Sequence, residues 1–438
     1  MQVEQIKQLI KQRKMNYFQI IAISVCVLIS MVDGYDVMTI AFVAPTIADL
    51  WSLSAPQLGF LFSAGLSGMV AGALFITPFA DKFGRRVVIM LCLLLLTIGM
   101  LASAFCENLT ELVLTRFFSG LAIGAIMPSI NTVIAEYASD RSRSFAIGIM
   151  AASYTSGSVI GGISYLILIK QLGWSYVFLL GSAFSCILLP LAFWLLPESL
   201  DFILLRNNAN SLIKLNSLLA KLELSTCATF PETATKSNYV NKQFSLFLKP
   251  AIMKATTLMT ASVACMMLSF YFLINWTPKI LVNFGYTKDV SVTGSLLMNI
   301  FGIMGGLSIG WLSQRYSVQK VCSIMAITAF CVVICFDVSS SIMSLLVILI
   351  ALIGYTTFGA MAGLYAIAPN IFPPMIRATG TGFVFGLARL IGTLGPYIAG
   401  LLMAAKLPQS YCFLIMSLPL LVSAGGIIFV KPYSERLH

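Results

Sequence analysis

Charge is scarce in this sequence. Only 10% of its 438 residues are Asp, Glu, Lys or Arg, whereas a soluble domain has about 25%. Apolar runs of roughly 20 residues recur instead, so the chain is expected to cross a membrane repeatedly as helices. The runs are too long and too uniformly apolar for barrel strands. We therefore expect neither an enzyme nor a nucleic-acid-binding protein, but a protein whose main partner is the lipid bilayer.

Histidine is almost absent, and the cysteines show no metal-binding pattern. The single histidine, His438, is the last residue, so proton transfer within the membrane must use carboxylates, with tyrosine as a helper. The 10 cysteines show neither metal-ligand spacing nor a CxxC pair, and most of them lie in apolar runs, where cysteine acts as a small hydrophobic residue. We expect no metal and no cofactor. Because no nucleotide-binding motif is present, the energy source is expected to be an ion gradient.

The apolar runs predict twelve membrane spans. We expect them at 17–44, 58–80, 86–105, 109–138, 144–169, 174–196, 252–281, 290–313, 320–337, 342–372, 378–404 and 410–430. The one long polar interruption, 197–250, reads as a linker between spans six and seven. The sequence therefore predicts an all-α membrane protein of two six-helix bundles, an N-terminal bundle at 1–196 and a C-terminal bundle at 251–438.

The basic residues are distributed unevenly between the two sides of these spans. The N-terminal tail, the linker, the C-terminal tail and the loops on their side hold most of the 27 lysines and arginines. The loops on the other side hold only Lys170, Lys279, Lys288 and Lys406. Because basic loops remain in the cytoplasm, both termini and the linker are expected to be cytoplasmic.

Two carboxylates interrupt the first span. Asp33 and Asp36 lie three positions apart, which puts both on one helical face. A charge at that depth costs roughly 2.5–3.5 kcal/mol or more and is usually directed at a cavity or a partner. Burial favours the neutral carboxyl group and a nearby arginine favours the charged one, so a change of exposure could load and release a proton. The structural alternative is that one carboxylate caps a helix break near Gly34 and the other pairs with a basic residue.

Two arginines lie inside spans. Arg116 and Asp36 are each about seven residues, roughly 10 Å, from the outer ends of their spans, so they can pair if their faces meet. Arg389 lies roughly 18 Å into span eleven, near the midplane where transporters hold substrate. A guanidinium stays charged and can fork onto a carboxylate. Arg389 is therefore the leading candidate for binding an anion, with a structural pair as its alternative.

Other polar residues are candidates for lining a polar path. Glu136 lies near the inner end of span four, beside Arg141 and Arg143, where it could pass a proton inward or form an ion pair. Arg116 and Asp36 are also candidates for contact with a substrate. Further candidates are Tyr35, Asn131, Tyr154, Asn275, Trp276, Asn299 and Tyr365. Ordinary helix packing is the alternative for each of them.

Several motifs resemble the major facilitator superfamily over nearly the whole chain. The loop Asp81-Lys82-Phe83-Gly84-Arg85-Arg86 resembles its loop between spans two and three, and the series Arg116, Gly120, Gly124 and Pro128 resembles its fourth-span motif. The resemblance implies a transporter that works by alternating access. It also implies a cytoplasmic gate at Asp81, Arg85 and Arg86, for which simple anchoring by positive charge is the alternative.

Within that superfamily the sequence is most similar to the aromatic acid:proton symporters. The motifs concerned are Asp33-Gly34-Tyr35-Asp36, Glu136-Tyr137, Asn275-Trp276-Thr277-Pro278, Arg377-Ala378-Thr379-Gly380 and Gly395-Pro396. The resemblance implies proton-coupled uptake of a small organic anion, such as a hydroxybenzoate, by a monomer in a bacterial inner membrane. The alternatives are another substrate (an amino acid or a dicarboxylate), an exporter, and a membrane sensor that has lost transport.

Overall fold

The computed structural model describes residues 3–205, 209–225, 227, 250–338, 342–373, 376–405 and 409–430. Within these ranges the chain is helical and contains no strand. Its elements are α1 (Val3–Gln12), α2 (Tyr17–Leu50), α3 (Ala55–Ala71), η1 (Gly72–Ile76), α4 (Thr77–Phe83), α5 (Arg85–Ala104), α6 (Leu109–Tyr137), α7 (Asp140–Leu168), α8 (Ser175–Leu195), α9 (Leu200–Leu205), α10 (Ala209–Lys221), α12 (Pro250–Asn283), α13 (Lys288–Leu312), α14 (Val318–Val338), α15 (Met343–Ile367), η2 (Ala368–Ile371), α16 (Arg377–Gly392), α17 (Leu394–Ala404) and α18 (Gln409–Phe429).

The predicted spans correspond in order to helices of the structure. In the described part of the chain, 11 helical segments are long and apolar enough to cross a membrane. The predicted fifth span is α7, which has 29 residues and is not among the 11. Its serines, threonines, glycines and tyrosines make it more polar than its neighbours, and it packs along α2 inside the bundle. The predicted all-α membrane fold is confirmed.

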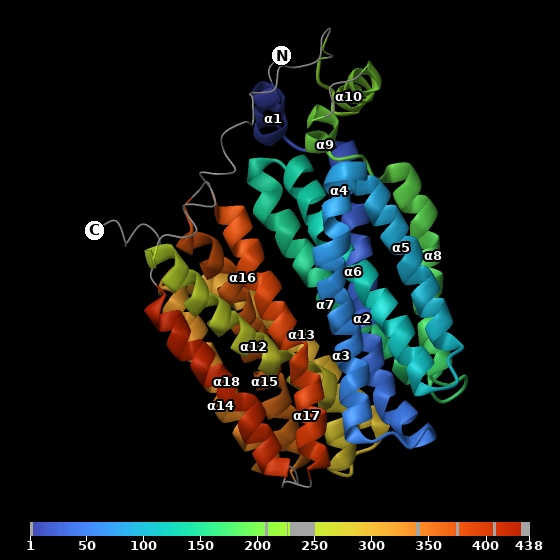
Figure 1. Ribbon diagram of the computed structural model, residues 1–438, viewed down its shortest axis with the longest axis vertical. Coiled ribbons are helices and arrows are strands. Elements are labelled where there is room, and N and C mark those ends of the chain that lie inside the picture. The colour runs from blue at the N-terminus through green and yellow to red at the C-terminus, as the bar shows by residue number, and fades with distance from the viewer. Residues whose placement is uncertain are drawn as a thin grey trace.

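The helices form two bundles. In the first, α2 packs on α7, α6 packs on α3 and α5, and α5 packs on α8. In the second, α15 packs on α13 and α14, and α12 packs on α16 and α18. Figure 1 shows the two groups side by side, with α1, α9 and α10 together at one end of the first. We call that end of the molecule the linker end and the opposite end the far end.

The first membrane helix is longer than predicted. The predicted span stopped at residue 44, whereas α2 continues through Pro45 to Leu50. A membrane helix tolerates proline because neighbouring groups satisfy the backbone atom that the ring leaves unpaired. The helix is also continuous through Gly34, so the alternative of a capped break at that glycine is wrong.

Glycines bring α2 and α7 into close contact. A Cβ atom at Gly34 would collide with the backbone carbonyl of Tyr154, and one at Gly157 would collide with that of Met31. Small residues at such a crossing let two membrane helices pack backbone against backbone. This contact, which we call the α2–α7 seam, fixes the position of the helix face that presents Asp33 and Asp36.

Ion pairs join the two bundles at the far end. Among the described residues, Asp49 at the end of α2 pairs with Lys279 of α12 at 3.5 Å and with Lys288 of α13 at 2.7 Å. Lys170, just beyond α7, pairs with Asp289 of α13 at 2.7 Å. These far-end ion pairs close one end of the interface between the bundles.

The same interface contains neutral contacts. α3 packs along α17, and the Ser63 hydroxyl donates a hydrogen bond to the carbonyl of Thr393 at 2.7 Å. The indole of Trp276 donates to the carbonyl of Pro396 at 3.0 Å and meets the ring of Phe62 edge-on. Helices of both bundles are therefore held together toward the far end.

Candidate functional site

Asp36 and Arg116 form a buried ion pair inside the first bundle. Arg116 Nη1 lies 2.8 Å from Asp36 Oδ1, and both side chains are 3% exposed. The hydroxyls of Ser103 and Ser119 accept hydrogen bonds from Arg116 Nη2 at 2.9 and 3.0 Å. The ring of Phe178 covers the guanidinium at 4.8 Å. The structure thus brings together the two charges whose depths matched in the sequence.

A small cavity lies against this ion pair. Its volume is about 30 Å³, and its lining includes Asp36, Arg116 and, from the second bundle, Asn275. A space of this size holds a water molecule or two. The Asn275 amide donates to the carbonyl of Tyr271 on its own helix at 2.8 Å. The cavity therefore extends the buried polar region of the first bundle to the surface of the second.

Asp33 has a different environment from Asp36. Its side chain is fully buried, and neither carboxylate oxygen has a hydrogen-bond partner among the described residues. Burying an unpaired charge costs several kcal/mol, a cost that a bound proton removes. Neither aspartate faces lipid, since both are buried within the protein.

Arg389 on α16 is a second charge within the helices, partly buried, in the other bundle. Three tyrosines from three helices interact electrostatically with its guanidinium, namely Tyr154 of α7, Tyr271 of α12 and Tyr365 of α15. Phe385 stacks on Tyr365 with ring centroids 4.2 Å apart. Arg389 Nε is buried without a hydrogen-bond partner, and no carboxylate of the described residues lies within 4.0 Å of the guanidinium. We call Arg389 and the three tyrosines the arginine cage.

Three other predicted substrate contacts are used within the protein. The Tyr35 hydroxyl donates to the carbonyl of Val177 at 2.7 Å and so ties α2 to α8. The Asn299 amide oxygen accepts from Ser158 at 3.2 Å, across the interface between the bundles. Trp276 is held at the contact with α3 and α17 described above. These polar groups therefore hold neighbouring helices together.

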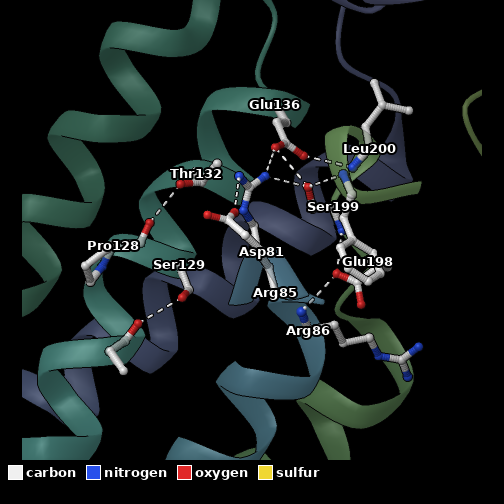
Figure 2. A network of polar contacts seen from close by, with 12 residues as sticks. Asp81, Arg85, Arg86, Pro128, Ser129, Thr132, Glu136, Glu198, Ser199 and Leu200 are labelled. Atoms are coloured by element: carbon white, nitrogen blue, oxygen red, sulfur yellow. Dashed lines mark hydrogen bonds and ion pairs between the residues drawn. The ribbon is translucent and has the colours of Figure 1, made fainter. Parts of the chain in front are cut away.

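The linker end contains a network centred on Glu136, shown in Figure 2. Arg85 forms an ion pair with Glu136 and lies 3.5 Å from Asp81. The Ser199 hydroxyl accepts from Arg85 at 2.6 Å and donates to Glu136 at 2.9 Å. The backbone N–H of Leu200 donates to the other Glu136 oxygen at 2.8 Å. The geometry favours the ion-pair alternative for Glu136.

Arg86 points away from this network (Figure 2). Its backbone N–H donates to Glu198 at 3.1 Å, while its guanidinium donates to the carbonyl of Phe193 and lies 5.4 Å from the centre of that ring. The three residues of the predicted gate therefore fall into two groups. Arg85 pairs with both Glu136 and Asp81, whereas Arg86 faces the end of α8.

Sequence reasoning missed Tyr271 of the cage and the serines that hold Arg116. Tyr271 lies within a run of aromatic residues that reads as lipid-facing. Tyr271 precedes Asn275 by four positions, which places both on one helical face. This spacing alone predicts that Tyr271 lies beside a candidate substrate contact. The serines Ser103 and Ser119 carry no such pattern, because their role depends on which helices meet.

Comparison with known proteins places the chain in a family. Residues 26–336 match the model of the Major Facilitator Superfamily. The chain belongs to this superfamily. The gallate transporter of Pseudomonas putida is 32% identical over 97% of this chain and 94% of its own length. The 4-hydroxybenzoate transporter PcaK of Acinetobacter baylyi is 30% identical over 97% and 93%.

Solved structures agree on the fold of the superfamily. The partially occluded, inward-open xylose transporter XylE from E. coli covers 94% of this chain and 100% of its own, with a TM-score of 0.73 and 14% identity. A bacterial homologue of the human lysosomal transporter Spinster has a TM-score of 0.68 and 17% identity, with 95% of each chain covered. The predicted superfamily is thus confirmed, and so is the prediction of a transporter rather than an enzyme.

Proposed function

We propose that this protein is a proton-coupled symporter that takes up a small aromatic carboxylate by alternating access. The observation that supports this most directly is the arginine cage, a partly buried cation with no acidic partner among the described residues. A guanidinium binds a carboxylate through two parallel hydrogen bonds, and tyrosine rings pack against an aromatic substrate. The names of the relatives, transporters of gallate and 4-hydroxybenzoate, support the same class of substrate.

The proton is assigned to Asp33. Asp36 and Glu136 each hold an arginine, whereas Asp33 has no partner among the described residues. Tyr154 interacts electrostatically with both Asp33 and Arg389, so one residue of the α2–α7 seam connects the proton site to the anion site. In this proposal Asp36 and Arg116 hold the first bundle together beside the transport path.

The proposed orientation places the linker end in the cytoplasm of a bacterial cell, with the chain a monomer in the inner membrane and both termini inside. The excess of lysine and arginine on that side supports it, although the C-terminal tail, with Lys431 and Arg436, lies outside the described residues. The far-end ion pairs then face the exterior. The division into bundles at 1–196 and 251–438, joined by the linker 197–250, belongs to the same proposal.

The test is uptake into liposomes that contain the purified protein. We expect radiolabelled 4-hydroxybenzoate to accumulate when the outside is acidic, and to equilibrate when the pH gradient is collapsed. Replacing Arg389 by Gln leaves the substrate carboxylate unpaired and should raise the KM by about a hundredfold. Arg315→Gln removes an exposed arginine at the linker end and should change nothing.

Three results would contradict the proposal. An unchanged KM in the Arg389→Gln variant would rule out the anion site, and accumulation that survives collapse of the gradient would rule out the proton coupling. Gradient-driven efflux supports the exporter alternative. Inhibition by unlabelled dicarboxylates or amino acids, but not by benzoates, would reassign the substrate.

A further inference from the structure

A large groove lies at the linker end, apart from the site described above. Its volume is about 870 Å³, and it runs between the ends of α5 and α8 on one side and the linker helices α9 and α10 on the other. Figure 1 shows α9 and α10 beyond the ends of the first bundle, on the side of α5 and α8. Neither the arginine cage nor the Glu136 network uses this space.

One wall of the groove is apolar and continuous with the lipid-facing surface. Leu91 of α5 and Phe193 of α8 line the groove and are exposed. Trp194, also in the lining, is 76% exposed. Exposed apolar side chains on membrane-spanning helices meet acyl chains, and tryptophan gathers where the hydrocarbon gives way to the headgroups. The groove therefore opens sideways into the bilayer at headgroup level.

The opposite wall is basic. Lys214, Ser217 and Lys221 line the groove from α10, and their spacing puts them on one helical face. The Lys221 ammonium also lies 5.5 Å from the ring of Phe18, which directs it toward the membrane helices. Basic, amphipathic helices of this kind lie along anionic membrane surfaces.

The charges around the groove do not cancel. Arg86 contributes a third cation, directed away from Glu136 (Figure 2). Among the described residues of the lining the one carboxylate is that of Glu198, whose Oε1 accepts backbone hydrogen bonds from Arg86 and Ser199 at 3.1 and 2.9 Å. With three cations against this one carboxylate, the described lining carries a net positive charge that attracts an anion.

From these two walls we propose that the groove binds an anionic phospholipid of the adjacent leaflet. The phosphate lies among Arg86, Lys214 and Lys221, and the acyl chains run past Leu91 and Trp194. A soluble anion would contact only the basic wall, and an apolar peptide would contact only the apolar wall. A phospholipid matches both walls. The bound lipid fastens the start of the linker to the first bundle. This proposal does not depend on the identity of the transported substrate.

Tryptophan quenching tests the proposal on the intact protein in phosphatidylcholine vesicles. We expect a small fraction of brominated phosphatidylglycerol to quench more fluorescence than the same fraction of brominated phosphatidylcholine. Trp194→Phe should abolish this excess. The double variant Lys214→Gln/Lys221→Gln should need about tenfold more phosphatidylglycerol for half-maximal quenching. The matched control Lys254→Gln/Lys320→Gln removes two exposed lysines from the linker end of the second bundle and should titrate like the wild type.

Each other outcome overturns the proposal. Equal quenching by the two lipids in the wild type shows that the groove has no preference for an anionic headgroup. An equal shift in both double variants shows that net surface charge attracts the lipid. Excess quenching that persists in Trp194→Phe places the lipid elsewhere. If millimolar inorganic phosphate removes the excess, the groove binds a soluble phosphate and not a lipid.

Discussion

Asp33 and Asp36 occupy the same helical face, one turn apart, and have opposite environments. Asp36 is neutralised by Arg116, which two serines hold in place. Asp33 is fully buried with no partner in the part of the chain that the structure describes. The sequence showed two acids at one depth. Only the rotation of α2 against its neighbours distinguishes a structural acid from a candidate proton site.

The two aspartates are expected to respond differently to the loss of charge. Asp33→Asn should retain the Tm of the wild type, because no partner is left unpaired, but should abolish accumulation driven by a pH gradient while exchange of substrate persists. Asp36→Asn leaves Arg116 as an uncompensated buried charge and should destabilise the protein by about 3–5 kcal/mol. Thermal unfolding and counterflow measurements check both. A lower Tm for Asp33→Asn than for Asp36→Asn would reverse the assignment.

At the scale of single helices, α2 and α12 show which features the sequence predicts and which it does not. The twelve spans were found because apolar runs are long and loops are polar, and the Asp36–Arg116 pair was found because depth along a helix can be counted from its end. The end of α2 was misplaced, because neighbouring helices compensate for Pro45 and a sequence does not show neighbours. Tyr271 was missed for a similar reason, since only the meeting of four helices makes it part of the cage.

The α2–α7 seam predicts a position-specific effect of a single methyl group. Gly157→Ala places a Cβ against the backbone of Met31 and should cost about 1–3 kcal/mol, lower the Tm and slow uptake. Gly148→Ala, on the same helix but with open space around it, is the matched control and should be tolerated. If both variants behave like the wild type, the helices are not held at backbone contact.

For the whole molecule, the contacts between the bundles determine which end is closed. Asp49 and Asp289 of one end take part in ion pairs that cross between bundles, whereas Asp81, Arg85 and Glu136 pair within the first bundle. Alternating access requires the far-end contacts to break when the transporter turns to the other side.

Removing the far-end ion pairs should therefore shift the conformational equilibrium. Each exposed pair contributes about 0.2–1 kcal/mol, so Asp49→Asn/Asp289→Asn, which removes three pairs, should increase the population open at the far end about threefold or more. Spin labels at positions 53 and 403, on a background without native cysteines, report this as a longer distance. Glu107→Gln serves as the control, because it removes an acid at the same end that has no ion pair with the other bundle among the described residues. No change in the distance distribution would mean that the neutral contacts alone hold the far end shut.

The separation of Asp33 and Arg389 into different bundles has a consequence for the membrane voltage. In the proposed mechanism, one ionised aspartate offsets one guanidinium in the empty carrier. With a proton on Asp33 and a carboxylate on Arg389, the sum is again zero. Since a voltage does work only on net charge that moves through it, about 2.3 kcal/mol per charge for each 100 mV, neither the outward nor the inward turn is driven electrically. A cell that has lost its membrane potential but is still alkaline inside would continue to take up substrate through this protein.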